Sequence, residues 1–347
     1  MPRDPVPDLA GLTFPARDER FDTLISRLSE PTDSPAGDNF VSNEDSYPRV
    51  AGELTRRAVA GSVYLGVGPD QNFTYIARAR PCLSFVIDFR RRNLLLHLLH
   101  KGLITLARDR AEYLSLLTAR GPGPLAADSS AADLVTAFTR AKFDRSLLED
   151  ASRRVADVVR PLNVLTPDEW REFTGIQARL AGPGMTARFL ALPMYPTFSR
   201  LMTTPDRDGR PAHWLSSEAD YQSVRAAQSG DRIIPLTADF AGPTTFARLG
   251  DWLRRRGFKV GTFYTSDVEF FLLRSGRFEP YLANLARLPW ADGVVLVRTS
   301  TREIDHPARV RGDSSTTVVI DVRRFLSDAN AGRVRTPDDL FSPERRP

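Results

Sequence analysis

The stretch from Val63 to Asp88 limits the possible folds of this 347-residue chain more than any other segment. It holds two short apolar runs, Ser62–Val67 and Leu83–Asp88, and between them a segment of helical composition, Asp70–Arg80. A strand, a helix and a second strand in this order form a crossover unit, and such units join parallel strands. The stretch therefore predicts the beginning of a parallel sheet.

The same alternation returns after a long, mostly helical region. Four more candidate strands follow in the second half of the chain: Arg232–Leu236, Phe258–Tyr264, Gly293–Thr299 and Thr316–Val322. Together the six runs predict an α/β fold, with a doubly wound, mostly parallel, Rossmann-like sheet and a helical insertion. In such a sheet ligands bind outside the carboxyl ends of the strands, so we expect functional residues directly after them.

Composition and pattern divide the chain into five segments. They are a loosely ordered N-terminal extension (1–46), the first half of the Rossmann-like domain (47–107), a helical insertion or cap (108–230), the second half of the domain (231–326) and a polar tail expected to be mobile (327–347). Inside the insertion, Thr166 followed by Pro167 predicts a helix start. The polar stretch Thr204–Trp214 predicts an exposed loop.

The net charge of +5 suggests nucleic acid as a partner, but only three of the 48 basic residues are lysines (Lys101, Lys142 and Lys259). The predominance of arginine is typical of a GC-rich genome, so we do not expect nucleic-acid binding. We see neither an apolar run of about 18 residues nor a signal peptide, which predicts a cytoplasmic protein without a membrane span. The single cysteine, Cys82, excludes an internal disulfide and a cysteine-based metal cluster.

The sequence Gly66-Val67-Gly68 follows the first strand directly and opens the next helix. The first glycine permits a tight turn, the second allows a ligand to approach the backbone, and the helix start offers free N–H groups. Asp88 ends the second strand, at the spacing of about 20 residues expected of an acid that binds ribose hydroxyls. The pattern thus predicts a nucleotide cofactor. The alternative is a plain strand-turn-helix in which Asp88 caps a helix.

The residues after the glycines distinguish between cofactors. A dinucleotide fingerprint has a third glycine or alanine at the position of Gln71, and Asp70 would repel a pyrophosphate at the helix start. S-adenosylmethionine (SAM) has no phosphate and carries a positive sulfonium, which an acid favours. We therefore expect SAM as the cofactor, bound by the turn and by the acid after the second strand: Gly66, Val67, Gly68, Asp70, Asn72 and Asp88.

The run Val63–Asp88 resembles motifs I and II of the class I SAM-dependent methyltransferases, and the resemblance extends over about residues 47–107 and 231–323. It implies methyl transfer from SAM to a small-molecule substrate. By the same resemblance, Asp239 corresponds to the acid that meets the adenine, and Tyr264-Thr265-Ser266 to the motif beside the transferred methyl group. The runs SNEDSYPRV, VYLGVGPDQNFTYIA and FYTSDVEFFL are also similar to those of an uncharacterised bacterial protein family.

Two positions depart from the methyltransferase pattern. Tyr64 stands where that family has an acid, two residues before the first glycine, and Asp70 replaces its third glycine. The hydrogen-bond acceptor for SAM that this acid provides has to come from elsewhere in the chain. The candidates lie in the segment before the first strand: Asn43, Glu44 and Glu53.

The run from Tyr264 to Glu269 follows a strand and opens a helix. Ser266 or Asp267 is a good N-cap there, and this local role explains much of the pattern. In the functional interpretation Tyr264 and Glu269 face the substrate, and Ser266 is a further substrate contact. In that interpretation Asp267 or Glu269 acts as a general base where the acceptor must lose a proton.

Two basic residues outside this run are further candidates for substrate contacts. Arg90 either pairs with Asp88 or binds an anionic substrate, and His213 lies in a loop from which it can reach a pocket. His97 and His100 share one helix face, and we expect them to be buried structural residues and not metal ligands.

The chain has no P-loop, no HExxH and no GxSxG motif, which argues against the enzyme classes that those motifs define. Two alternatives to a methyltransferase stay open. One is a catalytically inactive Rossmann-like binding or scaffold protein, and the other is a nucleotide-dependent oxidoreductase.

Overall fold

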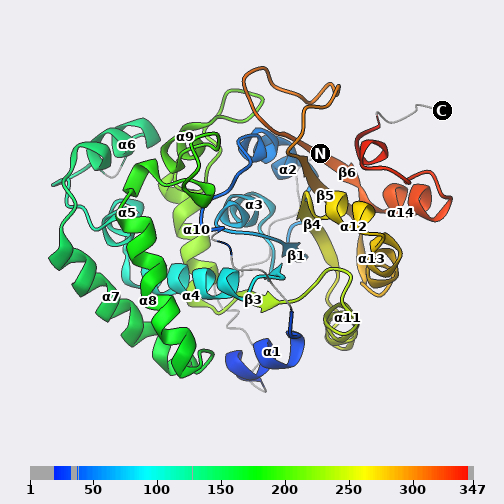
Figure 1. The fold of residues 1–347 in the computed structure, drawn as a ribbon, viewed down its shortest axis with the longest axis horizontal. Helices are drawn as coiled ribbons and strands as arrows, with labels where there is room; N and C mark the ends of the chain where they lie inside the picture. The colour runs from blue at the N-terminus through cyan, green and yellow to red at the C-terminus, as the bar shows by residue number, and fades with distance from the viewer. Residues whose placement is uncertain (1–18, 33–36, 38, 127, 343–347) are drawn as a thin grey trace.

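The computed structural model describes residues 19–342, apart from residues 33–36, 38 and 127. In this part of the chain, one sheet of six strands forms the centre of an α/β fold (Figure 1). The strands are β1 (Val63–Gly66), β2 (Leu83–Asp88), β3 (Ile233–Thr237), β4 (Val260–Ser266), β5 (Trp290–Ser300) and β6 (Thr316–Asp321). Each lies where the sequence predicts a strand, and the predicted α/β class with a mostly parallel sheet is confirmed.

The strands lie side by side in the order β3-β2-β1-β4-β5-β6. All neighbours are parallel except β5 and β6, which are antiparallel. The chain runs outward from β1 to β3 and then returns to β4 on the other side of β1. The strand order thus reverses between β1 and β4, and in sheets of this kind ligands usually bind in a crevice outside the carboxyl ends of the strands at that point.

Helices cover both faces of the sheet (Figure 1). One face carries η2 (Tyr47–Val50), α2 (Ala51–Arg57), α3 (Gln71–Ala79) and α4 (Arg91–Leu106), and the other carries α1 (Phe21–Leu28), α11 (Thr245–Arg255), α12 (Val268–Arg274), α13 (Phe278–Leu285) and α14 (Val322–Asn330). Amphipathic spacing explains the packing of α11, because Phe246, Leu249 and Leu253 follow one another at helical intervals and are all buried.

The helical insertion predicted for residues 108–230 packs against the α4 side of the sheet (Figure 1). It contains α5 (Arg110–Thr118), α6 (Ala131–Arg140), α7 (Arg145–Val159), η3 (Arg160–Leu162), α8 (Pro167–Ala181), η4 (Gly184–Thr186), η5 (Phe189–Ala191), α9 (Phe198–Thr203) and α10 (Glu218–Ser229). The predicted start of α8 is confirmed. The Thr166 hydroxyl accepts the Glu169 N–H, and the Glu169 carboxylate accepts the Thr166 N–H, which forms a capping box.

Three predictions about order and exposure were wrong. In the loop Thr204–Trp214, the last two residues, His213 and Trp214, are fully buried. In the tail, η6 (Pro337–Phe341) buries Leu340 and Phe341 against the domain, and the mobile interpretation fails for the described residues up to 342. In the N-terminal extension, residues 39–46 pack over the strand ends. We call these eight residues the strap.

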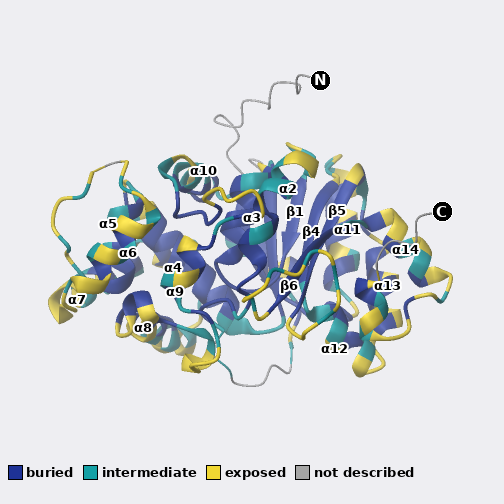
Figure 2. Ribbon diagram, turned by 90° about the horizontal axis from the view of Figure 1, so that it is seen from above, coloured by how far each residue is buried: buried dark blue, intermediate teal, exposed yellow. Residues whose placement is uncertain are grey.

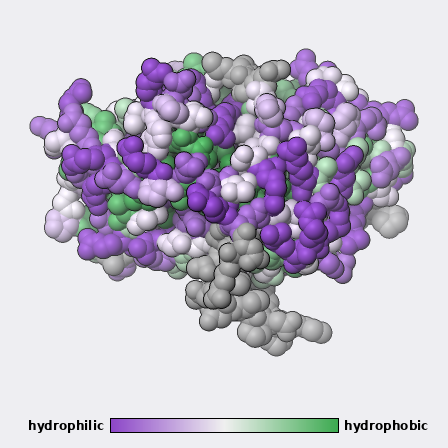
Figure 3. All heavy atoms as spheres, turned by 90° about the horizontal axis from the view of Figure 1, so that it is seen from below, coloured by the Kyte–Doolittle hydropathy of each residue, from purple (hydrophilic) through white to green (hydrophobic). Residues whose placement is uncertain are grey.

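Burial follows this layered plan. Figure 2 shows the strands dark blue between helices whose outer surfaces are yellow. Figure 3 shows one face of the molecule, where purple hydrophilic residues predominate and green hydrophobic residues form smaller patches. None of the helices in the described ranges combines the length and the apolar character that a bilayer crossing requires.

Candidate functional site

The glycine turn after β1 is held in shape by the side chain of Asn72. Its Nδ2 donates to the carbonyl oxygens of Val67 (2.9 Å), Gly68 (3.0 Å) and Pro69 (2.8 Å). A Cβ on Gly66 would lie 2.0 Å from Asn72 Oδ1, so only glycine fits there. Gly68 has a φ of +83°, which also favours glycine. Asn72 therefore shapes the turn from inside, which corrects its prediction as a direct cofactor ligand.

Asp88, at the end of β2, turns its carboxylate toward this glycine turn. It accepts the Arg90 N–H at 2.8 Å, and the Gly68 N–H also hydrogen-bonds to it. Burial raises the pKa of Asp88, while the Arg90 guanidinium, 3.6 Å away, opposes that rise. The N-cap position of α4 is Arg90, without any side-chain capping bond, so Asp88 is not the helix cap.

Asp70 follows the glycine turn and is buried against the insertion. Its Oδ2 accepts the indole N–H of Trp214 at 3.3 Å, and His213 Nε2 lies 3.8 Å away. Burial raises the pKa of Asp70 to about 6 and lowers that of His213 to about 3. His213 is therefore neutral at physiological pH, and the structure places it beside the turn although it comes from the distant insertion.

The same helix side of the crevice contains the two other predicted histidines. His97 Nε2 lies 2.9 Å from the Gly68 carbonyl oxygen, and His100 Nδ1 lies 2.8 Å from the Tyr113 hydroxyl. Burial lowers their pKa values to about 4 and about 3. Both are neutral and buried, as expected of structural histidines, but among the described residues His97 Nδ1 and His100 Nε2 have no hydrogen-bond partner.

The end of β4 has an unusual backbone. Ser266 adopts a φ of +53°, a left-handed conformation that non-glycine residues rarely take. Asp267 holds the N-cap position of α12 but makes no capping bond. Its carboxylate instead accepts the hydroxyls of Thr301 (3.1 Å) and Ser266 (3.4 Å). The predicted N-cap position is confirmed at Asp267, although its side chain makes no capping bond, and backbone strain of the kind seen at Ser266 is common at functional sites.

Glu44 of the strap reaches the same strand ends. Its carboxylate is fully buried and accepts the hydroxyls of Tyr264 (2.9 Å), Thr299 (2.6 Å) and Ser266. Burial, together with the nearby Asp267 carboxylate, raises the pKa of Glu44 to about 7. Of the three candidates in the preceding segment, Glu44 is the one beside Tyr64, whose pKa its charge helps to raise.

The strap is anchored next to Glu44 by Asp45. The Asp45 carboxylate accepts the backbone N–H groups of Ser314 (2.8 Å) and Ser315 (3.0 Å). A chain of hydroxyls then leads from Asp45 through Ser315, Ser46, Thr317 and Thr299 back to Glu44. The sequence analysis missed Asp45, and the adjacent acids in SNEDS were the available signal.

Two predicted site residues lie elsewhere. Glu269 belongs to the opposite face of the sheet, where it pairs with Arg298 at 2.9 Å and accepts the Tyr281 hydroxyl. Asp239 pairs with Arg277 at 2.6 Å on a partly exposed surface. The hydroxyl of Thr265, the residue after Tyr264, donates a hydrogen bond to Glu269. Because successive residues of a strand point to opposite faces of the sheet, Glu269 lies on the face opposite to the Tyr264 side chain. Glu269 as a base beside Tyr264 is therefore wrong.

The fold and the crevice define the class of protein: a Rossmann-like α/β protein with buried acids at the point where the strand order reverses. The chain belongs to the family described as "Domain of unknown function (DUF7790)", whose model matches residues 39–163 and 186–335. The match includes the strap and all six strands, and it omits the whole of α8. No curated protein matches the chain.

Proposed function

We propose that this protein binds SAM in the crevice between β1 and β4 and transfers its methyl group to a small-molecule acceptor. The charge of the crevice is the observation that carries the proposal. Four carboxylates gather at the strand ends, from Glu44, Asp70, Asp88 and Asp267. Arg90 faces two of them. Such a site attracts a sulfonium and an ammonium group, and it repels the phosphates of a dinucleotide.

The chain offers partners for the other parts of SAM. Asp88 is the acceptor for ribose hydroxyls, as expected of an acid at the end of the second strand. Gly66 and Gly68 permit the tight turn, whose inner side is filled by the side chains of Asn72, Tyr64 and Gln71. Class I methyltransferases have an acid at the position of Tyr64. In this chain Glu44 supplies that carboxylate, because the strap places Glu44 next to the Tyr64 ring.

SAM, when bound, supplies an electrophilic methyl group. The chain has to hold the acceptor in line with that group, and positioning of this kind is a large part of methyl-transfer catalysis. Asp267 is the base that we assign for an acceptor that must lose a proton. It is only half-buried, and burial raises its pKa, which brings a carboxylate closer to the range useful for proton transfer.

A titration calorimetry experiment tests the proposal with four ligands: SAM, S-adenosylhomocysteine, NAD and NADP. We expect SAM and S-adenosylhomocysteine to bind with dissociation constants below about 1 mM, which corresponds to about −4 kcal/mol. Asp88→Ala should weaken this binding. The control Asp292→Ala changes an exposed acid on β5 and should leave binding unchanged.

Absence of SAM and S-adenosylhomocysteine binding at about 1 mM would refute the proposal, since that concentration corresponds to very weak affinity. Binding of NAD or NADP in their place would establish the oxidoreductase alternative. SAM binding without methyl transfer to any acceptor tested would favour the inactive binding protein.

A further inference from the structure

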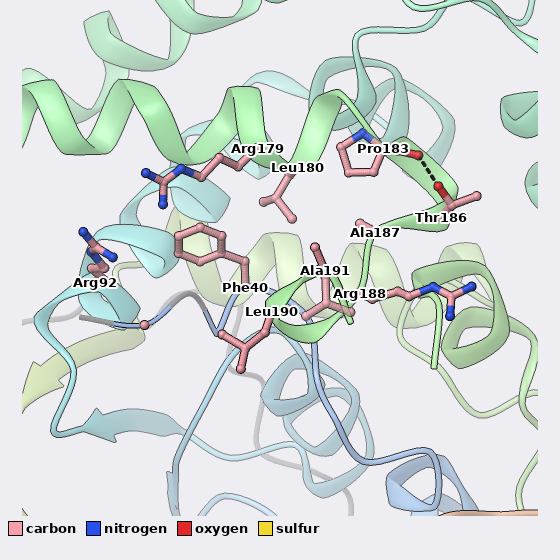
Figure 4. Close-up of a pocket in the computed structure, with 12 residues that line it drawn as sticks. Phe40, Arg92, Arg179, Leu180, Pro183, Thr186, Ala187, Arg188, Leu190 and Ala191 are labelled. Atoms are coloured by element: carbon pink, nitrogen blue, oxygen red, sulfur yellow. Dashed lines mark hydrogen bonds between the residues drawn. The ribbon is translucent and has the colours of Figure 1, made fainter. Parts of the chain in front are cut away.

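A pocket of about 700 Å³ lies where the strap, the amino end of α4 and the insertion meet (Figure 4). This volume lies in the range of small-molecule sites, about 300–1,000 Å³. A second, narrow cavity of about 10 Å³ adjoins it on the inside. We call the larger space the outer pocket and the smaller one the inner chamber. The residues that line both form a neck between them: Phe40, Val41, Leu180 and Ala187.

Apolar side chains form the wall of the outer pocket. Phe40 of the strap and Leu180 of α8 are buried there, and Leu190 of η5 is 44% exposed. In Figure 4 these three side chains approach one another from separate elements. The apolar tail of a ligand would therefore find contacts along this wall up to the neck.

The three arginines of the outer pocket, Arg92, Arg179 and Arg188, are engaged with groups of the protein. Arg92 pairs with Glu172, and Arg179 also has a contact of its own. Arg188 donates to two backbone carbonyl oxygens, at 2.6 and 3.4 Å, and in Figure 4 its side chain points away from Phe40. The outer pocket therefore favours an apolar group over a charged one.

The inner chamber, in contrast, contains a carboxylate without a counterion. Asp70 lines the chamber, and in the described part of the chain no lysine or arginine pairs with it. Its Oδ2 accepts the Trp214 indole N–H at 3.3 Å. The imidazole of His213, 3.8 Å away, is neutral because burial lowers its pKa to about 3. Asp70 thus has a hydrogen bond but no positive partner.

Aromatic rings complete the lining of the inner chamber. Phe40 and Phe198 both line it and are both buried. His100 lines it as well, and its Nε2 has no hydrogen-bond partner among the described residues. A carboxylate together with aromatic rings is a combination that recognises an ammonium group. A cavity of about 10 Å³ holds one water-sized group, which is the size of an ammonium headgroup.

We infer that the inner chamber and the outer pocket together bind a primary amine with an apolar tail. The ammonium group enters the chamber and pairs with the Asp70 carboxylate, beside the rings of Phe40 and Phe198. The tail passes the neck and packs on Leu180 and Leu190. The ammonium supplies the counterion that Asp70 lacks, which offsets the cost of burying this charge. Binding of the amine needs nothing from SAM.

Headgroup selectivity of the unaltered protein gives the first test. Octylamine, octanol and octanoate share one apolar chain and differ in charge, and each is titrated by calorimetry at about pH 8, where an alkylammonium is charged. The Asp70 carboxyl, whose pKa burial raises to about 6, is then ionised. We expect octylamine to bind at least about tenfold more tightly than octanol, and octanoate to bind most weakly, because only the amine makes a charge-assisted contact with the carboxylate. Octanol or octanoate affinity equal to that of octylamine, or no binding of octylamine, would overturn the inference.

Asp70→Asn gives the second test. Asparagine keeps the shape of the side chain and an acceptor for the Trp214 N–H but lacks the charge. Octylamine affinity should therefore fall about tenfold or more, and octanol affinity should stay unchanged. Asp168→Asn is the matched control, because Asp168 is an exposed acid of α8 paired with Arg171. Octylamine affinity that is the same in Asp70→Asn and in the control would contradict the assignment.

Ala187→Phe tests the path to the chamber without a change at Asp70. A phenyl group at the neck should block the passage and weaken octylamine and octanol alike, each at least about tenfold. Octylamine binding that survives this substitution would place the amine elsewhere and remove the proposed site.

Titration of SAM into the same samples separates this inference from the proposed function. Octylamine binding without SAM binding leaves the amine site standing and removes the methyltransferase. SAM binding without octylamine binding has the reverse meaning.

Discussion

Two buried glutamates stand on opposite faces of the sheet, close to the ends of β4 and β5. Glu44 is held by the hydroxyls of Tyr264, Ser266 and Thr299, with a second acid, Asp267, nearby. Glu269 is held by the Arg298 guanidinium and by hydroxyls. Burial raises the pKa of both carboxyls, but only Glu269 has a cation that opposes the rise.

The difference separates a structural acid from one that is set up for a ligand. A buried carboxyl that is already paired with a buried cation has no reason to change its charge state when a ligand arrives. A buried carboxyl without a cation is costly, and its charge state can follow the arrival of a positive group. We therefore assign Glu269 to the stability of the fold and propose Glu44 as the contact for a cationic ligand.

Removal of the Glu269 charge should have the largest effect on stability. Glu269→Gln leaves Arg298 buried without its partner, and loss of one member of a buried pair costs about 3–5 kcal/mol. Urea denaturation measures this loss. A change below about 1 kcal/mol would show that Arg298 finds another partner, and the comparison would then fail.

Glu44→Gln should have the opposite effects: a small change in stability and a large loss of SAM affinity. Hydroxyl groups can turn to serve an amide, so near pH 5, where the folded Glu44 carboxyl is protonated, we expect a stability change within about 1 kcal/mol. SAM affinity should fall about tenfold to a hundredfold, because a desolvated charge contact with the sulfonium or ammonium is lost. Calorimetry measures the affinity, with the surface variant Glu53→Gln as the control. Unchanged affinity in Glu44→Gln would remove Glu44 from the site.

The free protein should also lose stability as the pH rises through the titration of Glu44. The folded state holds the proton of this group up to a pKa of about 7, whereas the unfolded chain releases it near 4.5. The folded state therefore binds more protons in that interval, and the free energy of unfolding falls with increasing pH. The decline should be shallower in Glu44→Gln, in which the raised pKa of Asp70 still contributes, and urea denaturation at several pH values measures the difference. Parallel curves for the two proteins would argue against a raised pKa.

A matched pair of tyrosine variants gives the smallest effect and the sharpest comparison. Tyr281→Phe removes a hydrogen bond to the paired Glu269 and should cost about 1.5–3 kcal/mol. Below pH 7, where Glu44 is mostly protonated, Tyr264→Phe removes a hydrogen bond to an uncharged carboxyl and should cost about 0.5–1.5 kcal/mol. Thermal or urea unfolding of both variants measures the order. A larger loss for Tyr264→Phe would reverse the assignment of the two acids.

Local sequence signals were sufficient to predict most of the sheet. They also predicted one side of the candidate site, the glycine turn and Asp88. The six strands are apolar runs next to glycine, proline or charged residues, and the glycine turn and Asp88 fall at a known spacing in one crossover unit. The helices α5, α10, α13 and α14 were not predicted individually. Their amphipathic patterns are short and lie beside stronger signals.

The other side of the candidate site depends on contacts between parts of the chain that are distant in sequence. Glu44 meets Tyr264 across 220 residues, and His213 lies near Asp70 through the packing of the insertion on α3. No local pattern reports such contacts. Glu269 was misplaced for a different reason: the run after β4 was treated as one surface, although alternate residues of the strand face opposite sides of the sheet.

Proton release on SAM binding tests the central claim most directly. SAM is titrated at pH 7 into the protein in two buffers with different ionisation enthalpies, and the difference in observed heat gives the number of protons released. With the pKa of free Glu44 at about 7, binding of the cation should release about half a proton per site. The Glu44→Gln protein should release almost none. Absence of binding, or binding with the same proton count in both proteins, would contradict the account.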